Sequence, residues 1–128
     1  MSTDRQKLGK WGEEQGSRYL ESLGYHILCR NYRCRIGEVD IIAAKEGQLV
    51  FIEVKTRRTA SYGSPSEAVN YRKRAKYEKA ALYFIKETGQ KDVSCRFDII
   101  EVMVHPDGTC TINHIVNAYA AGFGSYYY

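Results

Sequence analysis

The chain lacks the features that mark several large classes of protein. It has only two prolines in 128 residues and is 44% hydrophobic, which is not the composition of a disordered chain. Its first residues contain no apolar run of the kind found in secretory signals, and no stretch approaches membrane-spanning length. We therefore expect a globular protein that does not enter a membrane.

Cysteine is present, but not in a zinc-binding arrangement. No two of the four cysteines are spaced as CxxC, and none has a histidine at ligand spacing. They are expected to be reduced side chains of the core, which suits a cytoplasmic protein. The sequence shows no repeat and no domain boundary. We therefore expect residues 1–128 to form one domain, with an ordered core over about 8–117 and a flexible C-terminal tail.

Basic residues outnumber acidic ones only slightly, 19 to 15, which gives a net charge of +4. A charge of this size is compatible with a nucleic-acid partner but does not identify one. The basic residues gather before and after an acidic hairpin and on a later helix. Those that we expect to contact nucleic acid are Arg33, Arg35, Arg57, Arg58, Lys73 and Lys76; the alternative for several is an ordinary solvated surface.

Hydrophobic periodicity predicts the order helix, three strands, helix, two strands. The first helix is expected over about 8–23, with an apolar stripe that includes Gly12, Tyr19 and Leu23. The strands are expected at about 25–32, 37–43, 49–55, 95–104 and 110–116, and the second helix at about 65–87, with Ser64 as its N-cap. This order predicts an α/β fold with a mixed central sheet.

The most informative stretch is the predicted hairpin, because it places charged residues on strands that are otherwise apolar. If the turn is centred on Glu46-Gly47, paired residues have numbers that sum to 93. Asp40 then lies opposite Glu53, with the two Cβ atoms about 5 Å apart, and Lys55 shares their face. Two carboxylates at this separation repel each other unless a cation lies between them. The geometry therefore predicts a metal site.

An alternative is that this face is solvated, with Glu38 and Lys55 forming only a cross-strand ion pair. Against it, the hairpin appears apolar on its other face and apolar at one end of the charged face, so the acids are expected to be half-buried and to need a partner. The apolar residues are Ile41, Ala43, Leu49, Val50, Phe51, Ile52 and Val54. Carboxylate oxygens suit Mg²⁺, with Mn²⁺ as a substitute, and an adjacent lysine could orient or deprotonate an attacking water.

Asp40, a turn and Glu53-Val54-Lys55 resemble the PD-(D/E)xK signature of restriction-endonuclease-like nucleases. Further segments, covering nearly the whole chain, are similar to the YraN family of predicted bacterial endonucleases. They are Gly12-Glu13, Gly24-Tyr25, Arg30-Asn31-Tyr32-Arg33, Gly37-Glu38-Val39-Asp40, Phe51 to Arg57, Lys73, Arg96-Phe97-Asp98 and Asn117-Ala118-Tyr119. The chain departs from the pattern in having Gly16 where alanine is usual and Val39 where the signature has proline.

The resemblance implies a restriction-endonuclease-like, three-layer fold and a Mg²⁺-dependent endonuclease acting on DNA, with branched or junction structures as one expected substrate. Asp40 and Glu53 would be metal ligands, Lys55 the catalytic lysine, and Glu13 an acid that assists the metal. Lys73 would reach toward the site. From the residues alone, the preferred interpretation of Glu13 is an ordinary solvated acid near a helix N-terminus. If the substrate is a junction, a homodimer is expected.

Two other functions stay open at this point. The first is a non-catalytic nucleic-acid-binding protein of the same fold, which would use the basic surface without a metal. The second is an interaction adaptor that uses the tyrosine-rich C-terminus, where three tyrosines end the chain. The presence of the complete set of Asp40, Glu53 and Lys55 favours the enzyme over both of these alternatives.

Overall fold

The computed structural model describes residues 3–58, 71–90 and 92–118. Its elements are α1 (Asp4–Ser22), β1 (His26–Arg33), β2 (Glu38–Lys45), β3 (Gln48–Arg58), α2 (Tyr71–Glu87), β4 (Ser94–Val104) and β5 (Cys110–Ile115). The predicted order of helices and strands is confirmed. The expectations for Ser64 as an N-cap and for the tyrosine-rich tail fall outside the described residues.

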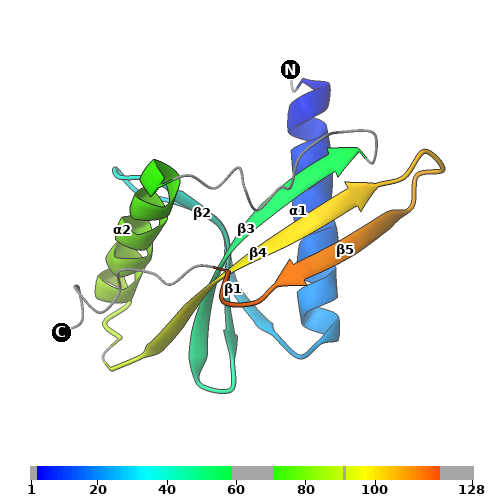
Figure 1. Cartoon of the computed structure of the whole chain (residues 1–128). Coiled ribbons are helices and arrows are strands. Elements are labelled where there is room, and N and C mark those ends of the chain that lie inside the picture. Colours follow the sequence, from blue (N-terminus) through cyan, green and yellow to red (C-terminus); the bar gives the residue numbers. More distant parts are fainter. Residues whose placement is uncertain (1–2, 59–70, 91, 119–128) are drawn as a thin grey trace.

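The five strands form one mixed sheet in the order β1-β2-β3-β4-β5. β3 and β4 are parallel, whereas the other three neighbouring pairs are antiparallel. A parallel pair needs a crossover connection, and α2 lies within that connection. Figure 1 shows α1 and α2 on opposite sides of the sheet, so the α/β prediction and its three layers are confirmed.

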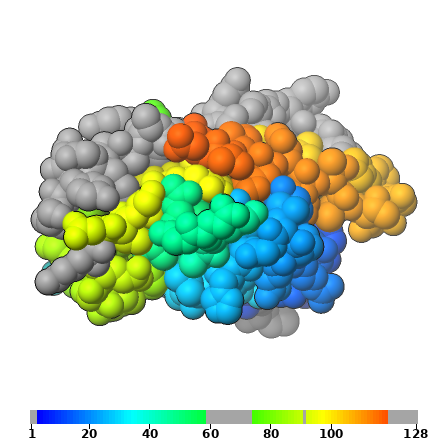
Figure 2. All heavy atoms as spheres, turned by 90° about the horizontal axis from the view of Figure 1, so that it is seen from below, coloured from blue at the N-terminus to red at the C-terminus, as the bar shows by residue number. Residues whose placement is uncertain are grey.

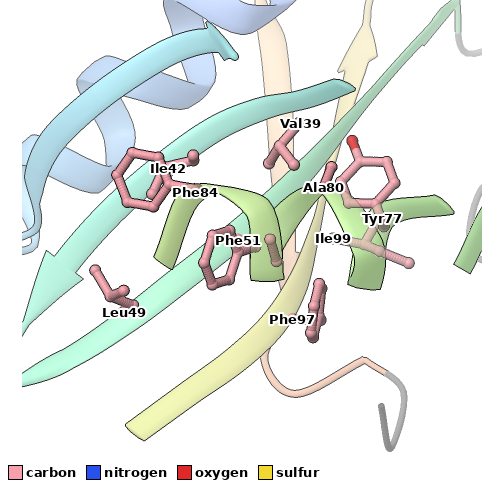
Figure 3. Close-up of a cluster of buried hydrophobic side chains, with 10 residues drawn as sticks. Val39, Ile42, Leu49, Phe51, Tyr77, Ala80, Phe84, Phe97 and Ile99 are labelled. Atoms are coloured by element: carbon pink, nitrogen blue, oxygen red, sulfur yellow. The ribbon is translucent and has the colours of Figure 1, made fainter. Parts of the chain in front are cut away.

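Each face of the sheet has its own apolar core. Toward α2, Phe51 stacks on Phe97 with ring centroids 5.5 Å apart and meets Phe84 edge to face at 6.2 Å. Figure 3 shows this cluster, with Tyr77 at the end away from Leu49. Toward α1, the core residues are Leu20, Tyr25, Ile41, Ala43, Val50, Ile52, Ile100 and Val102. Because the sheet is covered on both sides, a charged side chain within it must be held by specific partners.

α1 begins a turn earlier than predicted and buries a different face. Thr3 caps the helix in a capping box with Gln6. The predicted start relied on the apolar stripe and did not use this capping signal. The buried residues are Gly12, Gly16, Ser17 and Leu20, whereas Leu23 is 45% exposed. The predicted stripe was therefore partly wrong, because apart from Leu20 the contact with the sheet is formed by small residues.

Gly12 is the point of closest approach between α1 and β3. A Cβ atom at this position would lie only 2.8 Å from Cβ of Thr56, so no side chain fits without movement of the helix. At Gly16, by contrast, an added Cβ would make ordinary contacts of 3.6 to 3.8 Å with Val54, Ile100 and Ile41. The close packing at Gly12 fixes the height at which the next residue, Glu13, sits beside the sheet.

A buried polar cluster joins β4 to β5 on the α1 side. Asp98 accepts hydrogen bonds from Arg96 Nε at 2.9 Å and from the backbone N–H of Asn117 at 2.9 Å, and its Oδ2 lies 2.7 Å from His114 Nε2. Burial alone would raise the pKa of Asp98, but these hydrogen bonds, led by the one with His114, hold that pKa below its usual value. The cluster therefore anchors the end of β5 to the carboxylate of Asp98.

Figure 2 views the molecule from below and shows the turn between β2 and β3 at the surface, between α2 and the segment that joins α1 to β1. Asp40, Glu53 and Lys55 lie toward the other end of these two strands.

Among the described residues, no helix is both long enough and apolar enough to cross a membrane.

Candidate functional site

The predicted register of the hairpin is confirmed over its paired residues. Ile41 pairs with Ile52 and Ala43 with Val50, and both pairs sum to 93. The ladder between β2 and β3 ends at Ile41, and the next contact is made by a side chain: the backbone N–H of Val54 donates to Asp40 Oδ2 at 2.9 Å. Asp40 therefore lies where the two strands separate, tied to β3 by its carboxylate.

Several acids act on Asp40 at this point. Burial is the largest influence and raises its pKa from 3.8 to about 7, against the lowering effect of the Val54 N–H. The negative charges of Glu13, Glu53 and Glu38 raise it further, in that order. Acids from α1, β2 and β3 thus converge on one carboxyl group, which resists ionisation until a positive charge compensates it.

Tyr77 of α2 is a further contact of Asp40. Its hydroxyl donates to Asp40 Oδ2 at 3.3 Å, while its ring is buried in the cluster beneath α2. The sequence analysis did not identify this tyrosine as a residue of the site. The signal that could have identified it is general, because a buried tyrosine hydroxyl needs a hydrogen-bond partner.

Glu53 and Lys55 form a close ion pair on β3. The distance from Lys55 Nζ to Glu53 Oε1 is 2.7 Å, and the two side chains are 18% and 5% exposed. Lys55 therefore shares the face of Glu53, as predicted. Glu38 is paired with Arg33, with 3.1 Å between Glu38 Oε2 and Arg33 Nε.

Glu13 is half-buried on α1 and belongs to the same group of acids. Burial raises its pKa, and a hydrogen bond from the Asn31 side chain opposes that shift. Glu14 does not join the acids: it lies on the exposed side of α1, with its carboxylate 2.8 Å from Arg30 and 3.1 Å from Arg18. The helix thus presents one acid to the site and the next to solvent, as its period requires.

The basic residues do not all lie together. Arg57 and Arg58 continue β3 beyond Lys55, with Arg58 exposed at its end. Lys76 is exposed on α2, and Gly37 lies against it: a Cβ at Gly37 would be 3.4 Å from Lys76 Cβ.

The remaining basic candidates lie near the connection between β1 and β2 or at the start of α2. Arg35 is exposed in the segment between β1 and β2, near Gly37, and Arg33 is held by its ion pair with Glu38. Lys73 lies in the first turn of α2, and its side chain is outside the described part of the structure.

The comparisons with known proteins address the same span of the chain. The model of the uncharacterised protein family UPF0102 matches residues 12–102, which include Glu13, Asp40, Glu53 and Lys55. The chain belongs to this family. A UPF0102 protein of Syntrophomonas wolfei is 45% identical over 113 residues, which are 88% of this chain and 97% of the relative.

Two further UPF0102 relatives match at similar levels. The protein of Desulforamulus reducens is 46% identical over 121 residues, covering 92% of this chain and 99% of the relative. That of Geobacter sulfurreducens is 47% identical over 116 residues, which are 91% of each chain. Family membership, predicted from the motifs, is thus shown at the level of UPF0102, and the reaction must be argued from the site.

Proposed function

We propose that this UPF0102 protein is a metal-dependent endonuclease that hydrolyses phosphodiester bonds in DNA. The observation that supports this proposal best is the convergence of three acids and a lysine at the point where β2 and β3 separate. Asp40 is held by Val54 and Tyr77, and Glu53 by Lys55, so the acidic groups are oriented before any ligand arrives. Preorganised carboxylates beside a lysine suit metal-assisted hydrolysis of a phosphate ester.

The residues present fit Mg²⁺ or Mn²⁺. Within the described residues, no group of three or more His, Cys, Asp and Glu side chains could hold a metal ion by itself. Mg²⁺ does not require such a cage, because it is usually bound by one or two carboxylates and completed by water and substrate phosphate. Asp40 and Glu53 would be those carboxylates, and a cation would offset the burial and the neighbouring negative charges that raise the pKa of Asp40.

Lys55 and Glu13 would have separate roles in the hydrolysis. When bound, Mg²⁺ would neutralise charge on the phosphate and lower the pKa of a coordinated water. Lys55 lies 2.7 Å from a carboxylate oxygen of Glu53, which holds its amino group beside the proposed metal ligands. Lys55 would therefore orient the attacking water and stabilise negative charge on the phosphate. Glu13 would support Asp40 from the α1 side.

The substrate would be held through its phosphates. Arg57 and Arg58 follow Lys55 along β3 and would meet phosphates next to the cleaved bond, while Arg35 and Lys76 would contact the backbone farther away. Lys73 would add a contact from the start of α2. Contacts of this kind give affinity without reading sequence, so the proposed selectivity is for DNA structure, with branched DNA cleaved by a homodimer as the specific form of the proposal.

The proposal is tested with purified protein, a panel of branched, flapped, duplex and single-stranded DNA, and a titration of Mg²⁺ and Mn²⁺. We expect cleavage that requires metal and that falls at least about 100-fold in Glu53→Ala and in Lys55→Ala. Glu13→Gln should also reduce the rate, whereas its neighbour Glu14→Gln, on the exposed side of the same helix, should not.

Two outcomes would contradict this mechanism. Cleavage that persists in both Glu53→Ala and Lys55→Ala would mean that the activity does not come from this site. Salt-sensitive DNA binding without cleavage, indifferent to metal and unchanged in Asp40→Asn, would favour a non-catalytic nucleic-acid-binding protein instead.

A further inference from the structure

Asn31 has an unusual backbone conformation at a position that faces the site. It lies inside β1 with φ of +55°, a left-handed conformation that is sterically costly for residues other than glycine. The pairing of β1 with β2 continues on both sides of it without a change of register, from Arg30 with Ile41 to Tyr32 with Val39. Asn31 is therefore the residue of β1 that stands opposite Asp40.

Both strands change faces at this level. Tyr32 and Cys29 are three residues apart, yet both pack against the cluster beneath α2. On β2, Val39 and Ile42 are likewise three apart and belong to that cluster. Side chains of a regular strand alternate with a period of two, so residues three apart would lie on opposite faces. The alternation is thus broken at Asn31 and at Asp40 together.

Local irregularities of this kind redirect side chains and are common beside active sites. This part of β1 lies against α1, because Arg30 donates to Glu14 at 2.8 Å, and a side-chain hydrogen bond with Asn31 lowers the pKa of Glu13. Asp40, opposite Asn31, is directed to the Val54 N–H and the Tyr77 hydroxyl. One irregularity in the sheet therefore sets the direction of two of the acids on which the proposed function depends.

We propose that Asn31 is a positioning residue whose left-handed backbone turns its amide onto the Glu13 carboxylate and keeps that carboxylate beside Asp40. The amide is suited to this role because it donates a hydrogen bond without adding charge to a group of acids. The inference rests on the proposed function, in which Glu13 supports the metal ligand Asp40. Side chains that orient metal ligands typically change metal affinity by 10- to 100-fold when removed.

The decisive variant is Asn31→Gly, because glycine adopts the left-handed conformation freely and only the amide is lost. Mn²⁺ binding is measured by isothermal titration calorimetry in the absence of DNA. We expect Asn31→Gly to weaken Mn²⁺ binding about 10-fold while the melting temperature stays close to that of the wild type. The matched control is Glu46→Gly, which makes the same backbone change at φ of +50° in the turn at the far end of the hairpin and should leave Mn²⁺ affinity unchanged.

A double-mutant cycle with Glu13→Gln separates positioning from a general loss of order. If Asn31 acts through Glu13, Asn31→Gly should have little further effect on Mn²⁺ affinity in the Glu13→Gln background. A readout without metal is the side-chain amide of Asn31 in the ¹H–¹⁵N NMR spectrum, which should shift in Glu13→Gln but not in Glu14→Gln.

The inference and the proposed function fail in different ways. Wild-type protein that binds Mn²⁺ with an affinity unaltered by Asn31→Gly would overturn the inference alone. The same holds if Asn31→Gly weakens binding equally in the Glu13→Gln background. Wild-type protein that binds no Mn²⁺ would overturn the proposed metal site, and the inference with it.

Discussion

Replacing Asp40 by asparagine should stabilise the metal-free protein, and only above a certain pH. Asparagine has the same shape, and its carbonyl oxygen can still accept the hydrogen bonds that Val54 and Tyr77 donate. What the substitution removes is the ability to ionise. The folded protein holds Asp40 in an environment that opposes ionisation, because the group is buried and because other carboxylates lie nearby.

The size and sign of the effect follow from the pKa of Asp40, which rises from 3.8 to about 7 on folding. The folded state therefore binds this proton more tightly than the unfolded state does. The stabilisation from the protonated group is fully present below pH ~4 and is lost as the pH rises to about 7. A shift of about three pKa units corresponds to about 4 kcal/mol, so Asp40→Asn should be more stable than the wild type by up to that amount at pH 8.

The assay is urea unfolding followed by circular dichroism at pH 4.5 and pH 8, in EDTA. The difference in free energy of unfolding between Asp40→Asn and wild type should be small at pH 4.5 and several kcal/mol at pH 8. Glu21→Gln serves as the control, because it also removes one negative charge but from an exposed position. Its free energy of unfolding should match that of the wild type at both pH values. Adding Mn²⁺ should then stabilise the wild type more than the variant, since binding to the folded state alone raises its stability.

A difference between Asp40→Asn and wild type that is the same at both pH values would refute this reasoning. It would show that the carboxyl group is ionised in the folded protein without cost, for example because it lies in contact with solvent. A variant that is less stable than the wild type at pH 8 would contradict it more strongly. In either case the acids around Asp40 could not be the source of a cation preference.

Three further predictions concern packing and the buried polar cluster, and each is checked by the free energy of unfolding in urea. Gly16→Ala should stabilise the protein by about 1 kcal/mol, because alanine favours helix and its methyl would meet Val54 at an ordinary 3.6 Å. Gly12→Ala should destabilise it by about 1–3 kcal/mol, because α1 must move away from β3. Asp98→Ala should cost about 3–5 kcal/mol by leaving Arg96 without its carboxylate. Since the pKa of Asp98 is lowered on folding, its contribution is present above pH ~4 and disappears as the pH falls further, so this variant should differ least from wild type in acid.

Much of the fold could be predicted from local patterns. The strands of the hairpin were identified with their register, because β-branched runs on either side of Glu46-Gly47 leave one turn that pairs them consistently. The boundaries were less accurate: β3 extends to Arg58, three residues beyond the predicted end. Parallel pairing with β4 over its whole length supports those residues, and a partner so distant in sequence leaves no local signal.

The face of α1 shows the limit of periodicity. Large apolar residues predicted a stripe that included Leu23, but this residue is exposed and the buried face is made by two glycines, a serine and Leu20. The close approach of Gly12 to Thr56 explains the difference, because a helix that lies this near a sheet has no room for a large side chain. The same contact brings Glu13, rather than Glu14, toward the acids.

The sequence by itself determined the register of the hairpin, from its turn to the pair of Ile41 with Ile52, and the side of β3 on which Lys55 lies. These depend on alternation and on a short turn, which are local properties of the chain. Only the tertiary structure decided that Tyr77 of α2 reaches Asp40 and that Glu13 of α1, rather than Glu14, adds its charge there. Both join elements far apart in the chain, so they exist only once the two helices are packed against the sheet.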